Sequence, residues 1–518
     1  MSAGTVDPYR SGQRPGRDGF AHLLHAEWTK FRTVRGWLIG TVVAALVMVL
    51  LGLLAASGTH SSCLGPSGAA CQAVPVGPDG EAVTDSFSFA HQPLEGNGSI
   101  TVRVSSMTGL ITYPPPNHDA IVPGVVPWAK AGVIIKERTT QGSAYAAMLV
   151  TGGHGVRMQY DYTHDTAGRP GGVSAGSPRW LRLTRSGDTI TGYESSDGTQ
   201  WTRVGSAHLA GLSSTVQAGL FVASPADVEV TEGIAGGSAA RLTQATAVFD
   251  NVSLQGGWAG GAWVHDDLGG QPGNPALAQG SLDESGGRFT LSGTGDIAPL
   301  TGGRGIERTL IGTFAGLIVV AVVSTMFVTA EYRRSMIRTT LAASPRRGRV
   351  LAAKAIVIGL VTFVTGLAAA AVAVPLGEWM LRANGNYVLP VTSLTELRVV
   401  AGTGALLAVT AVLAVAMGTM LRHSAAAVTA VIVAIVLPYI LATAPTWPAG
   451  VSEWLLRLTP AAAFAVQQSQ PQYPQVITNY TALAGYYPLA PWGGFAVLCA
   501  YAAVALVLAA LLLRRRDV

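Results

Sequence analysis

The chain has 518 residues, of which 49% are hydrophobic and only 12% are charged. This composition is typical of a membrane protein rather than of a soluble enzyme. The formal net charge of +5 does not indicate a nucleic-acid partner, and we expect none. Residues 57–305 carry 13 basic and 20 acidic side chains, so the basic excess lies in the remaining, apolar part of the chain.

Residues 1–18 are polar, contain Gly, Pro and Arg, and lack an apolar period, which predicts a disordered N-terminus. From Phe20 to Phe31 apolar residues recur at helical spacing, with charged residues between them. This pattern predicts an interfacial amphipathic helix that lies on the inner leaflet, against membrane lipids, and leads into the first span within residues 19–56. A cytoplasmic extension of that span is the alternative. The candidate interfacial residues are Glu27, Trp28, Lys30 and Arg32.

Six windows of about 20 apolar residues are long enough to cross a hydrocarbon core of about 30 Å. They are residues 37–56, 311–330, 355–374, 399–421, 425–444 and 492–513, and none contains a charged side chain. Lys and Arg cluster before the first window, between the second and third, and after the last. By the positive-inside rule these segments are cytoplasmic. We therefore expect a polytopic α-helical protein of the plasma membrane with six transmembrane helices, cytoplasmic termini, and residues 57–305 outside.

Residues 57–84 are expected to form a stalk after the first span. Cys63 and Cys71 lie there, on the oxidising side of the membrane and on either side of a turn-rich segment. We expect a local disulfide between them, and two free thiols are the alternative.

Residues 85–256 show short alternating segments bounded by Gly, Asp and Ser turns, which predicts an inserted, all-β, extracytoplasmic sandwich. Residues 257–305 are richer in glycine, and we expect them to form a β extension or linker. Residues 306–518 then hold the remaining five spans. The order of FSFAHQPL (87–94), WAKAGVII (128–135), WLRLTR (180–185), SDGTQW (196–201) and FDNV (249–252) resembles the concanavalin-like, laminin-G-like jelly roll.

The jelly-roll resemblance implies a glycan or cell-wall ligand. Most aromatic residues of these strands alternate with polar ones and are expected in the core. The candidates for glycan contact are Trp128, Tyr193 and Trp201. A membrane-bound glycosidase is disfavoured because the segment lacks the paired carboxylates that glycoside hydrolysis requires. The histidines are scattered, so we expect no metal site.

An ordered set of charged and turn residues lies between the second and third spans. The set is Glu331, Tyr332, Arg333, Arg338, Pro345, Arg346 and Arg347. Together with AEWTKFR (26–32) and Thr459-Pro460 in the loop before the last span, it resembles type 2 ABC transporter permeases, in particular actinobacterial members. The resemblance implies that this loop docks on an ATPase and couples it to the bundle. From charge alone, the loop would be read as ordinary positive-inside residues.

The chain has four lysines and none follows a glycine, so it lacks the Gly-Lys pair of a phosphate-binding P-loop. We expect no enzyme activity and no cofactor bound by this chain, with ATP hydrolysed by a separate ABC ATPase subunit. The resemblance also implies a homodimer or a paralogous permease. The predicted function is the membrane subunit of an ATP-driven exporter with a lectin-like external domain. The alternative is a membrane-anchored glycan-binding or sensor protein without transport.

Overall fold

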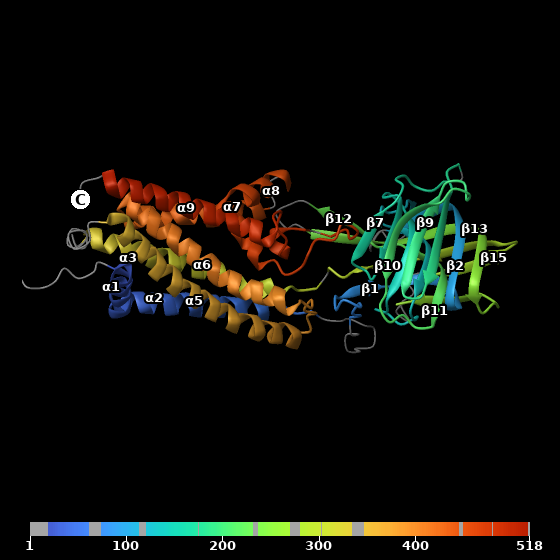
Figure 1. Ribbon diagram of the computed structural model, residues 1–518, viewed down its shortest axis with the longest axis horizontal. Helices are drawn as coiled ribbons and strands as arrows, with labels where there is room; N and C mark the ends of the chain where they lie inside the picture. The colour runs from blue at the N-terminus through green and yellow to red at the C-terminus, as the bar shows by residue number, and fades with distance from the viewer. Residues whose placement is uncertain are drawn as a thin grey trace, which may run out of the picture.

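The computed structural model describes residues 19–61, 74–112, 121–174, 176–231, 237–269, 280–301, 303–333, 346–444, 449–478 and 480–515. Its helices form a bundle at one end of an elongated molecule, and its strands form a separate β domain at the other (Figure 1). Cys63, Cys71, Arg338 and Pro345 lie outside the described residues, and so do residues 1–18.

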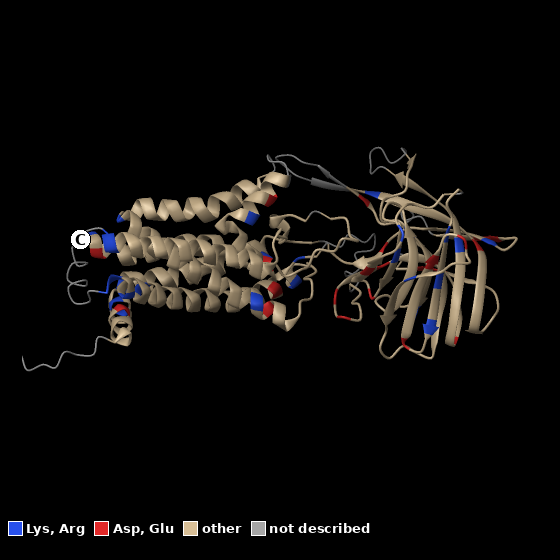
Figure 2. Ribbon diagram, turned by 45° about the horizontal axis from the view of Figure 1, so that its top comes forward, with Lys and Arg blue, Asp and Glu red and all other residues tan. Residues whose placement is uncertain are grey.

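Six helical segments of the described chain are long and apolar enough to cross a membrane. They are α2 (Arg35–Ser57), η1 with α3 (Ile306–Leu310 and Thr313–Arg333), α5 (Arg347–Ala383), α6 (Ser393–Leu421), α7 (Ser424–Thr443) and α9 (Pro491–Arg515). The shorter helices are α1 (Phe20–Thr33), α8 (Ala449–Leu458), η2 (Pro460–Gln467) and η3 (Ala482–Ala484). Figure 2 shows charged residues at the two ends of the bundle and uncharged ones between them. The predicted fold class, a polytopic helical membrane protein with an inserted β domain, is confirmed.

We call the end of the bundle that carries α1 and the C-terminus the basic end, and the opposite end the sandwich end. At the basic end α1 and α2 are separate helices, because Val34 between them has extended backbone angles (φ −94°, ψ 101°). Figure 1 shows α1 turned away from the direction of α2. Phe31 anchors α1, with ring centroids 6.3 Å from Trp37 and 6.1 Å from Phe327. Residues 20–33 therefore do not continue the helix of the first span, and the alternative of a cytoplasmic extension of that span is wrong.

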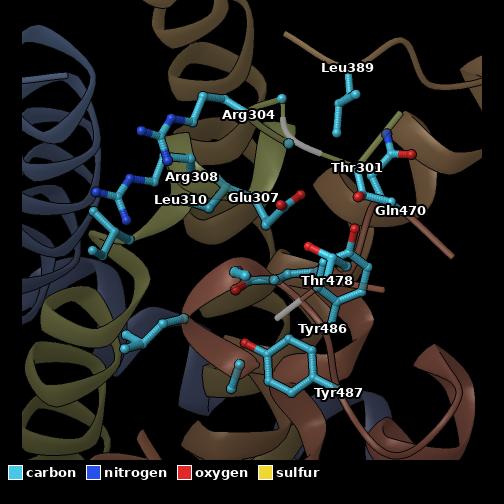
Figure 3. A pocket seen from close by; sticks show the side chains of 18 of the residues that line it. Thr301, Arg304, Glu307, Arg308, Leu310, Leu389, Gln470, Thr478, Tyr486 and Tyr487 are labelled. Atoms are coloured by element: carbon cyan, nitrogen blue, oxygen red, sulfur yellow. The ribbon is translucent and has the colours of Figure 1, made fainter. Parts of the chain in front are cut away.

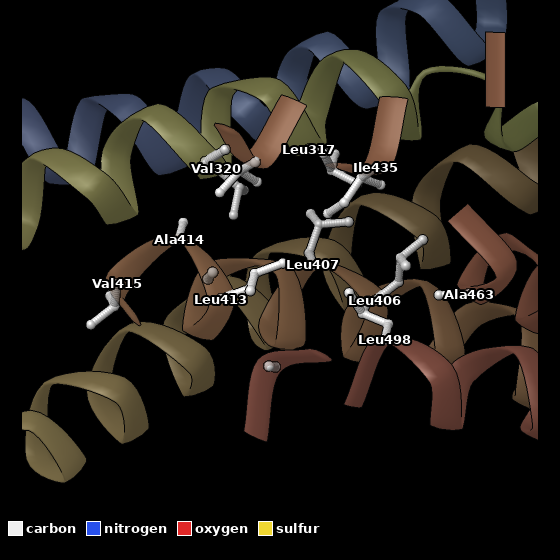
Figure 4. Packing of buried hydrophobic residues seen from close by; sticks show 14 of the residues in the cluster. Leu317, Val320, Leu406, Leu407, Leu413, Ala414, Val415, Ile435, Ala463 and Leu498 are labelled. Carbon is white, nitrogen blue, oxygen red and sulfur yellow. The ribbon is translucent and has the colours of Figure 1, made fainter. Parts of the chain in front are cut away.

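Helix α6 lies at the centre of the bundle, where 67% of its apolar window is buried. Leu406 and Leu407 belong to a cluster with side chains of α3, α7, η2 and α9 (Figure 4). Against α5 the backbones themselves meet, since a Cβ on Gly366 would lie 2.9 Å from the Cα of Gly404. Small residues allow this close approach in membrane helices.

All strands that the structure describes belong to the insertion. They are β1 (Val83–Asp85), β2 (Phe87–Thr112), β3 (Ile121–Pro123), β4 (Lys130–Lys136), β5 (Tyr145–Thr151), β6 (Val156–Tyr160), β7 (His164–Ala167), β8 (Arg179–Ser186), β9 (Thr189–Ser195), β10 (Thr202–His208), β11 (Thr215–Ala223), β12 (Asp227–Thr231), β13 (Gly237–Trp258), β14 (Val264–Leu268), β15 (Ser281–Ser285), β16 (Arg288–Gly293) and β17 (Ile297–Pro299).

The long strand β2 is shared by two layers of antiparallel strands. Its first half pairs with β14 and β11, and from β11 the layer continues through β4, β5, β6 and β7. Its second half pairs with β8 and β13, and this layer continues to β9 and β10 on one side and to β16 and β15 on the other. Apolar residues from both layers, such as Val133 and Leu183, form one buried core.

Residues 257–305 contribute more to the sandwich than the expected extension or linker. Strand β14 pairs with β2 in one layer, and β16 pairs with β13 in the other. Strand β17 pairs instead with β1, in register Val83↔Pro299 to Asp85↔Ile297. The chain that leaves α2 and the chain that returns to η1 therefore meet in a two-stranded sheet.

Candidate functional site

Four charged side chains from three helices meet at the basic end of the bundle. Lys354 of α5 donates to Oε2 of Glu27 on α1 (2.7 Å) and to Oε1 of Glu331 on α3 (2.6 Å). Lys30 of α1 donates to the same two carboxylates, at 2.8 Å and 3.1 Å. Glu27, Glu331 and Lys354 are buried, whereas Lys30 is partly exposed. We call this group the Lys354 cluster.

Burial explains why the Lys354 cluster must stay intact. A charge removed from water is tolerated only when it is paired, and breaking one partner leaves the other uncompensated. Two acids and two bases make the cluster neutral, and the Lys354 ammonium also lies 5.1 Å from the centroid of the Phe327 ring. The cluster therefore ties α1 to α3 and α5, so that a displacement of α1 is felt by both helices.

The structure separates the residues predicted to contact an ATPase. Arg333 and Arg346 are exposed at the basic end. Tyr332 lies under the guanidinium of Arg422, 5.3 Å from the ring centroid, and Arg347 donates to the carbonyl of Leu513 at 2.5 Å. Glu331 is buried in the Lys354 cluster, so its carboxylate is not exposed for direct contact with a partner, and its role in ATPase coupling stays a prediction.

The four interfacial candidates on α1 differ in their exposure to solvent. Trp28 is 43% exposed and Arg32 is exposed, whereas Lys30 is half-buried. Glu27 is 2% exposed, so its predicted place on a polar, interfacial face is wrong. The helix period placed Glu27 among polar residues, but its partner Lys354 lies 327 residues away along the chain.

In the sandwich, two of the three glycan candidates lie on one face. The strand registers align Thr101, Arg182, Tyr193 and Arg203 in a row across β2, β8, β9 and β10. Arg182 donates to the hydroxyl of Thr101 (2.9 Å), and its guanidinium lies 3.8 Å from the ring centroid of Trp201. We call this surface the Arg182 face.

A tight turn places Trp201 on the Arg182 face. Oδ1 of Asp197 accepts hydrogen bonds from the backbone N–H groups of Thr199 (2.8 Å) and Gln200 (2.9 Å). These bonds hold the pKa of the Asp197 carboxyl below its usual range. Gly198 in this turn has φ +76° and packs on Trp180, where a Cβ would lie 2.8 Å from the ring.

The third glycan candidate is not on that face. Trp128 is 4% exposed and stacks on His154, with ring centroids 4.1 Å apart. The guanidinium of Arg157 lies 5.4 Å from the Trp128 ring. Both neighbours cover the indole, so the prediction that Trp128 contacts a glycan is wrong.

Buried ion pairs attach the β1–β17 sheet to the sandwich. Lys136 of β4 donates to Oδ2 of Asp85 (2.7 Å), and both side chains are fully buried. Lys130 of the same strand donates to Oδ1 of Asp296 (2.6 Å), directly before β17. Burial lowers the pKa of Lys136, and the Asp85 carboxylate opposes this shift. We call the two pairs the lysine clamp.

Further hydrogen bonds hold the sandwich and the chain segments on either side of it to the bundle. Asn384, in the α5–α6 loop, donates to the carbonyl of Ala56 at 3.1 Å, at the end of α2. The same loop bonds to the returning chain, where the N–H of Arg304 donates to the carbonyl of Tyr387 (2.9 Å). Gln475, between α8 and α9, donates to the carbonyl of Tyr162 in the sandwich at 3.3 Å. Gln475 therefore joins the bundle directly to the sandwich, while the α5–α6 loop contacts the end of α2 and the chain that returns to η1.

A cavity of about 270 Å³ lies at the sandwich end of the bundle, between η1, α7 and the chain that precedes α9. Polar side chains including Arg304, Glu307 and Arg308 line it together with apolar residues (Figure 3). Nearby, the buried segment η2 is held by Gln467, which donates to the hydroxyls of Thr313 (3.1 Å) and Thr403 (3.0 Å). Sequence analysis missed η2, since eight apolar residues are too few to span a membrane.

The structure is that of a multi-pass membrane protein with six membrane-length helical segments. It has a buried ion cluster at one end of the bundle and an inserted sandwich at the other. The family model described as ABC-2 family transporter protein matches residues 155–518, which is more than half of the chain. The chain therefore belongs to the ABC-2 transporter family and is a membrane transport subunit. The match begins next to β6 and includes α3 to α9, while α1 and α2 precede it. The predicted type 2 permease is thus confirmed at the level of the family.

No curated protein matches the chain. Among solved structures, a functionally unknown protein from Saccharomyces cerevisiae is 16% identical, with 35% of this chain and 81% of that one covered and a TM-score of 0.21. A scytalido-glutamic peptidase with a transition-state analogue inhibitor is 13% identical, covers 42% of this chain and 100% of its own, and has a TM-score of 0.26. The GH43 protein BlXynB from Bacillus licheniformis is 15% identical, with 31% and 27% covered and a TM-score of 0.18. With scores this low the concanavalin-like resemblance stays a prediction.

Proposed function

We propose that the chain is the membrane subunit of an ATP-driven exporter, with its termini in the cytoplasm and its sandwich outside the cell. An ABC ATPase is the general partner of the family, and the observation that carries the proposal here is the arrangement at the basic end. Exposed Arg333 is the last residue of α3, and exposed Arg346 directly precedes α5. Both helices are joined to α1 by the Lys354 cluster. A partner docked on these arginines would therefore move α3 and α5 with α1.

Reversing the charge of both exposed arginines (Arg333→Glu with Arg346→Glu) is expected to weaken binding of the ABC ATPase at least about tenfold, because like-charge contacts cost several kcal/mol across an interface. The measurement is co-purification of the full chain with its ATPase, together with ATPase activity. The matched control is Arg382→Glu, an exposed arginine at the sandwich end. Unchanged binding and unchanged ATPase stimulation in the double variant would remove the docking role.

We further propose that the Arg182 face binds a glycan or cell-wall polysaccharide beside the exporter. Tyr193 supplies a half-buried ring, and Arg182 and Arg203 flank it with hydrogen-bond donors. Trp201 offers a second ring once Arg182 moves from it. The family membership favours transport over the alternative of an anchor without transport.

Truncating both rings (Tyr193→Ala with Trp201→Ala) is expected to reduce glycan binding at least about tenfold, since each ring–ligand stacking contact contributes about 1 kcal/mol. The full chain in nanodiscs would be applied to a glycan array. Tyr160→Ala is the control, because Tyr160 is a half-buried tyrosine on β6 in the other layer. If the control lost binding equally, or if no glycan bound the unaltered chain, the lectin-like part of the proposal would fail while the transport part stood.

A further inference from the structure

Arg304 and Arg308, at the sandwich end of the bundle, differ from the other arginines there in the partners of their guanidinium groups. The others have local partners: Arg382 pairs with Glu378 (2.8 Å), Arg457 pairs with Glu453 (3.0 Å), and Arg398 donates to the carbonyl of Gln468 (2.7 Å). Within the described residues the guanidinium groups of Arg304 and Arg308 have no hydrogen bond or ion pair, and Nε of Arg308 is buried. A buried donor without an acceptor costs about 1–3 kcal/mol, so an acceptor from outside the chain would be stabilised here.

The carboxylate between these arginines does not serve as their partner. Glu307 accepts a short hydrogen bond from the hydroxyl of Ser469. It is also confined by backbone, because a Cβ on Gly305 or Gly485 would lie 2.0 Å or 2.5 Å from Oε1 of Glu307. Figure 3 shows both guanidinium groups extending to one side and the Glu307 carboxyl to the other. Glu307 therefore does not pair with Arg304 or Arg308, although all three residues line the cavity.

The cavity has an apolar part next to this charged part. Leu310, Ile311, Phe314 and Leu483 line it together with the arginines. Ile311 is 44% and Leu483 63% exposed, so large apolar side chains remain open at its wall. Because η1 begins the second span, Arg304 and Arg308 lie at the level expected for a lipid headgroup, and Ile311 and Phe314 lie further along the span, where the chain of a lipid would begin. The charged part of the lining therefore matches the headgroup of a lipid, and the apolar part matches the beginning of its chain.

We propose that this cavity binds the phosphate-bearing head of an anionic amphiphile. The two guanidinium groups of Arg304 and Arg308 hold the phosphate, which suits their planar, multidentate donors. Ile311, Phe314 and Leu483 contact the first part of the apolar chain. The site stands apart from the proposed ATPase docking and from the Arg182 face, since it requires neither an ATPase nor a glycan.

The test measures binding of short-chain lipids to the full chain in a neutral detergent. Dioctanoyl phosphatidylglycerol is expected to bind at least about tenfold more tightly than dioctanoyl phosphatidylcholine, and at least about tenfold more tightly than inorganic phosphate. Equal affinity for the two lipids would overturn the charge requirement. Equal affinity for inorganic phosphate would overturn the amphiphile in favour of a free anion.

Variants locate the site. Arg304→Gln with Arg308→Gln is expected to weaken phosphatidylglycerol binding at least about tenfold, and Arg304→Gln alone, at an exposed side chain, about threefold or more. The control is Arg382→Gln with Arg457→Gln, which removes two arginines that already have partners. Full binding by both test variants, or equal loss in the control, would overturn the assignment. The exposed single variant keeps the test decisive if the double variant folds poorly.

Discussion

Replacing Lys354 by methionine is expected to lower the free energy of unfolding by about 3–5 kcal/mol, the usual cost of removing one partner of a buried ion pair. Methionine keeps the length of the side chain but leaves Glu27 and Glu331 with only the partly exposed Lys30 between them. The cluster then carries a net negative charge in a buried site. Denaturant titration of the full chain in mixed micelles would measure the loss.

Lys30→Met is the matched control, because Lys30 contacts the same two carboxylates from a position that is 31% exposed. We expect it to cost only about 1 kcal/mol. Adding Glu331→Gln to Lys354→Met restores neutrality and should recover part of the stability. The burial argument would be wrong if Lys354→Met were no more harmful than Lys30→Met.

Replacing Asp85 by asparagine is expected to destabilise the sandwich by about 3 kcal/mol at neutral pH, because the buried Lys136 ammonium loses its counter-charge. Burial already holds the pKa of Lys136 below its ordinary value of 10.5, and loss of Asp85 lowers it further. The unfolded chain then binds more protons than the folded chain from the lowered pKa up to about 10.5, so the stability of the variant rises with pH across this range. Its deficit against the unaltered chain should shrink accordingly.

Chemical denaturation of the full chain at several pH values from neutral to alkaline would check this, with tryptophan fluorescence as the signal. Asp283→Asn serves as the control, because Asp283 is an exposed carboxylate on β15. A deficit that does not depend on pH would show that the hydrogen bonds that Asp85 accepts, for example from the Tyr162 hydroxyl, matter more than its charge.

The sequence was sufficient to predict the six spans and the β insertion, because membrane length and strand alternation are local signals. The helices extend beyond the apolar windows, as α5 does from 355–374 to Arg347–Ala383, since amphipathic ends contribute few apolar residues. The Lys354 cluster could not be predicted. Glu27 and Lys354 are far apart in the chain, and each alone resembles a solvated charge.

In the sandwich, local sequence patterns predicted which residues are aromatic candidates, but they did not predict which of these side chains are covered by neighbouring residues. Trp128 lies in a turn and Trp201 follows a bend, yet Trp128 is covered by His154 and Arg157 whereas Trp201 lies on the Arg182 face. The contribution of residues 257–305 to the two layers of the sandwich was not predicted, because glycines interrupt the alternation of apolar and polar residues in these strands. Their long-range partners in β2 and β13 supply the pairing that the local sequence does not reveal.

The pairing of β1 with β17 also brings the two ends of the sandwich to adjacent points. Asp85 and Ile297 are register partners, so the 211 residues between them leave and return at adjacent points. A two-residue Asn-Gly turn is the usual way to connect such antiparallel neighbours. Joining Asp85 to Ile297 in this way would keep the β1–β17 register in a small hairpin but remove the sandwich residues that bury Val83 and Ile297. The same geometry suits a transporter that gained its external domain by insertion, since the bundle's own connection need not be lengthened.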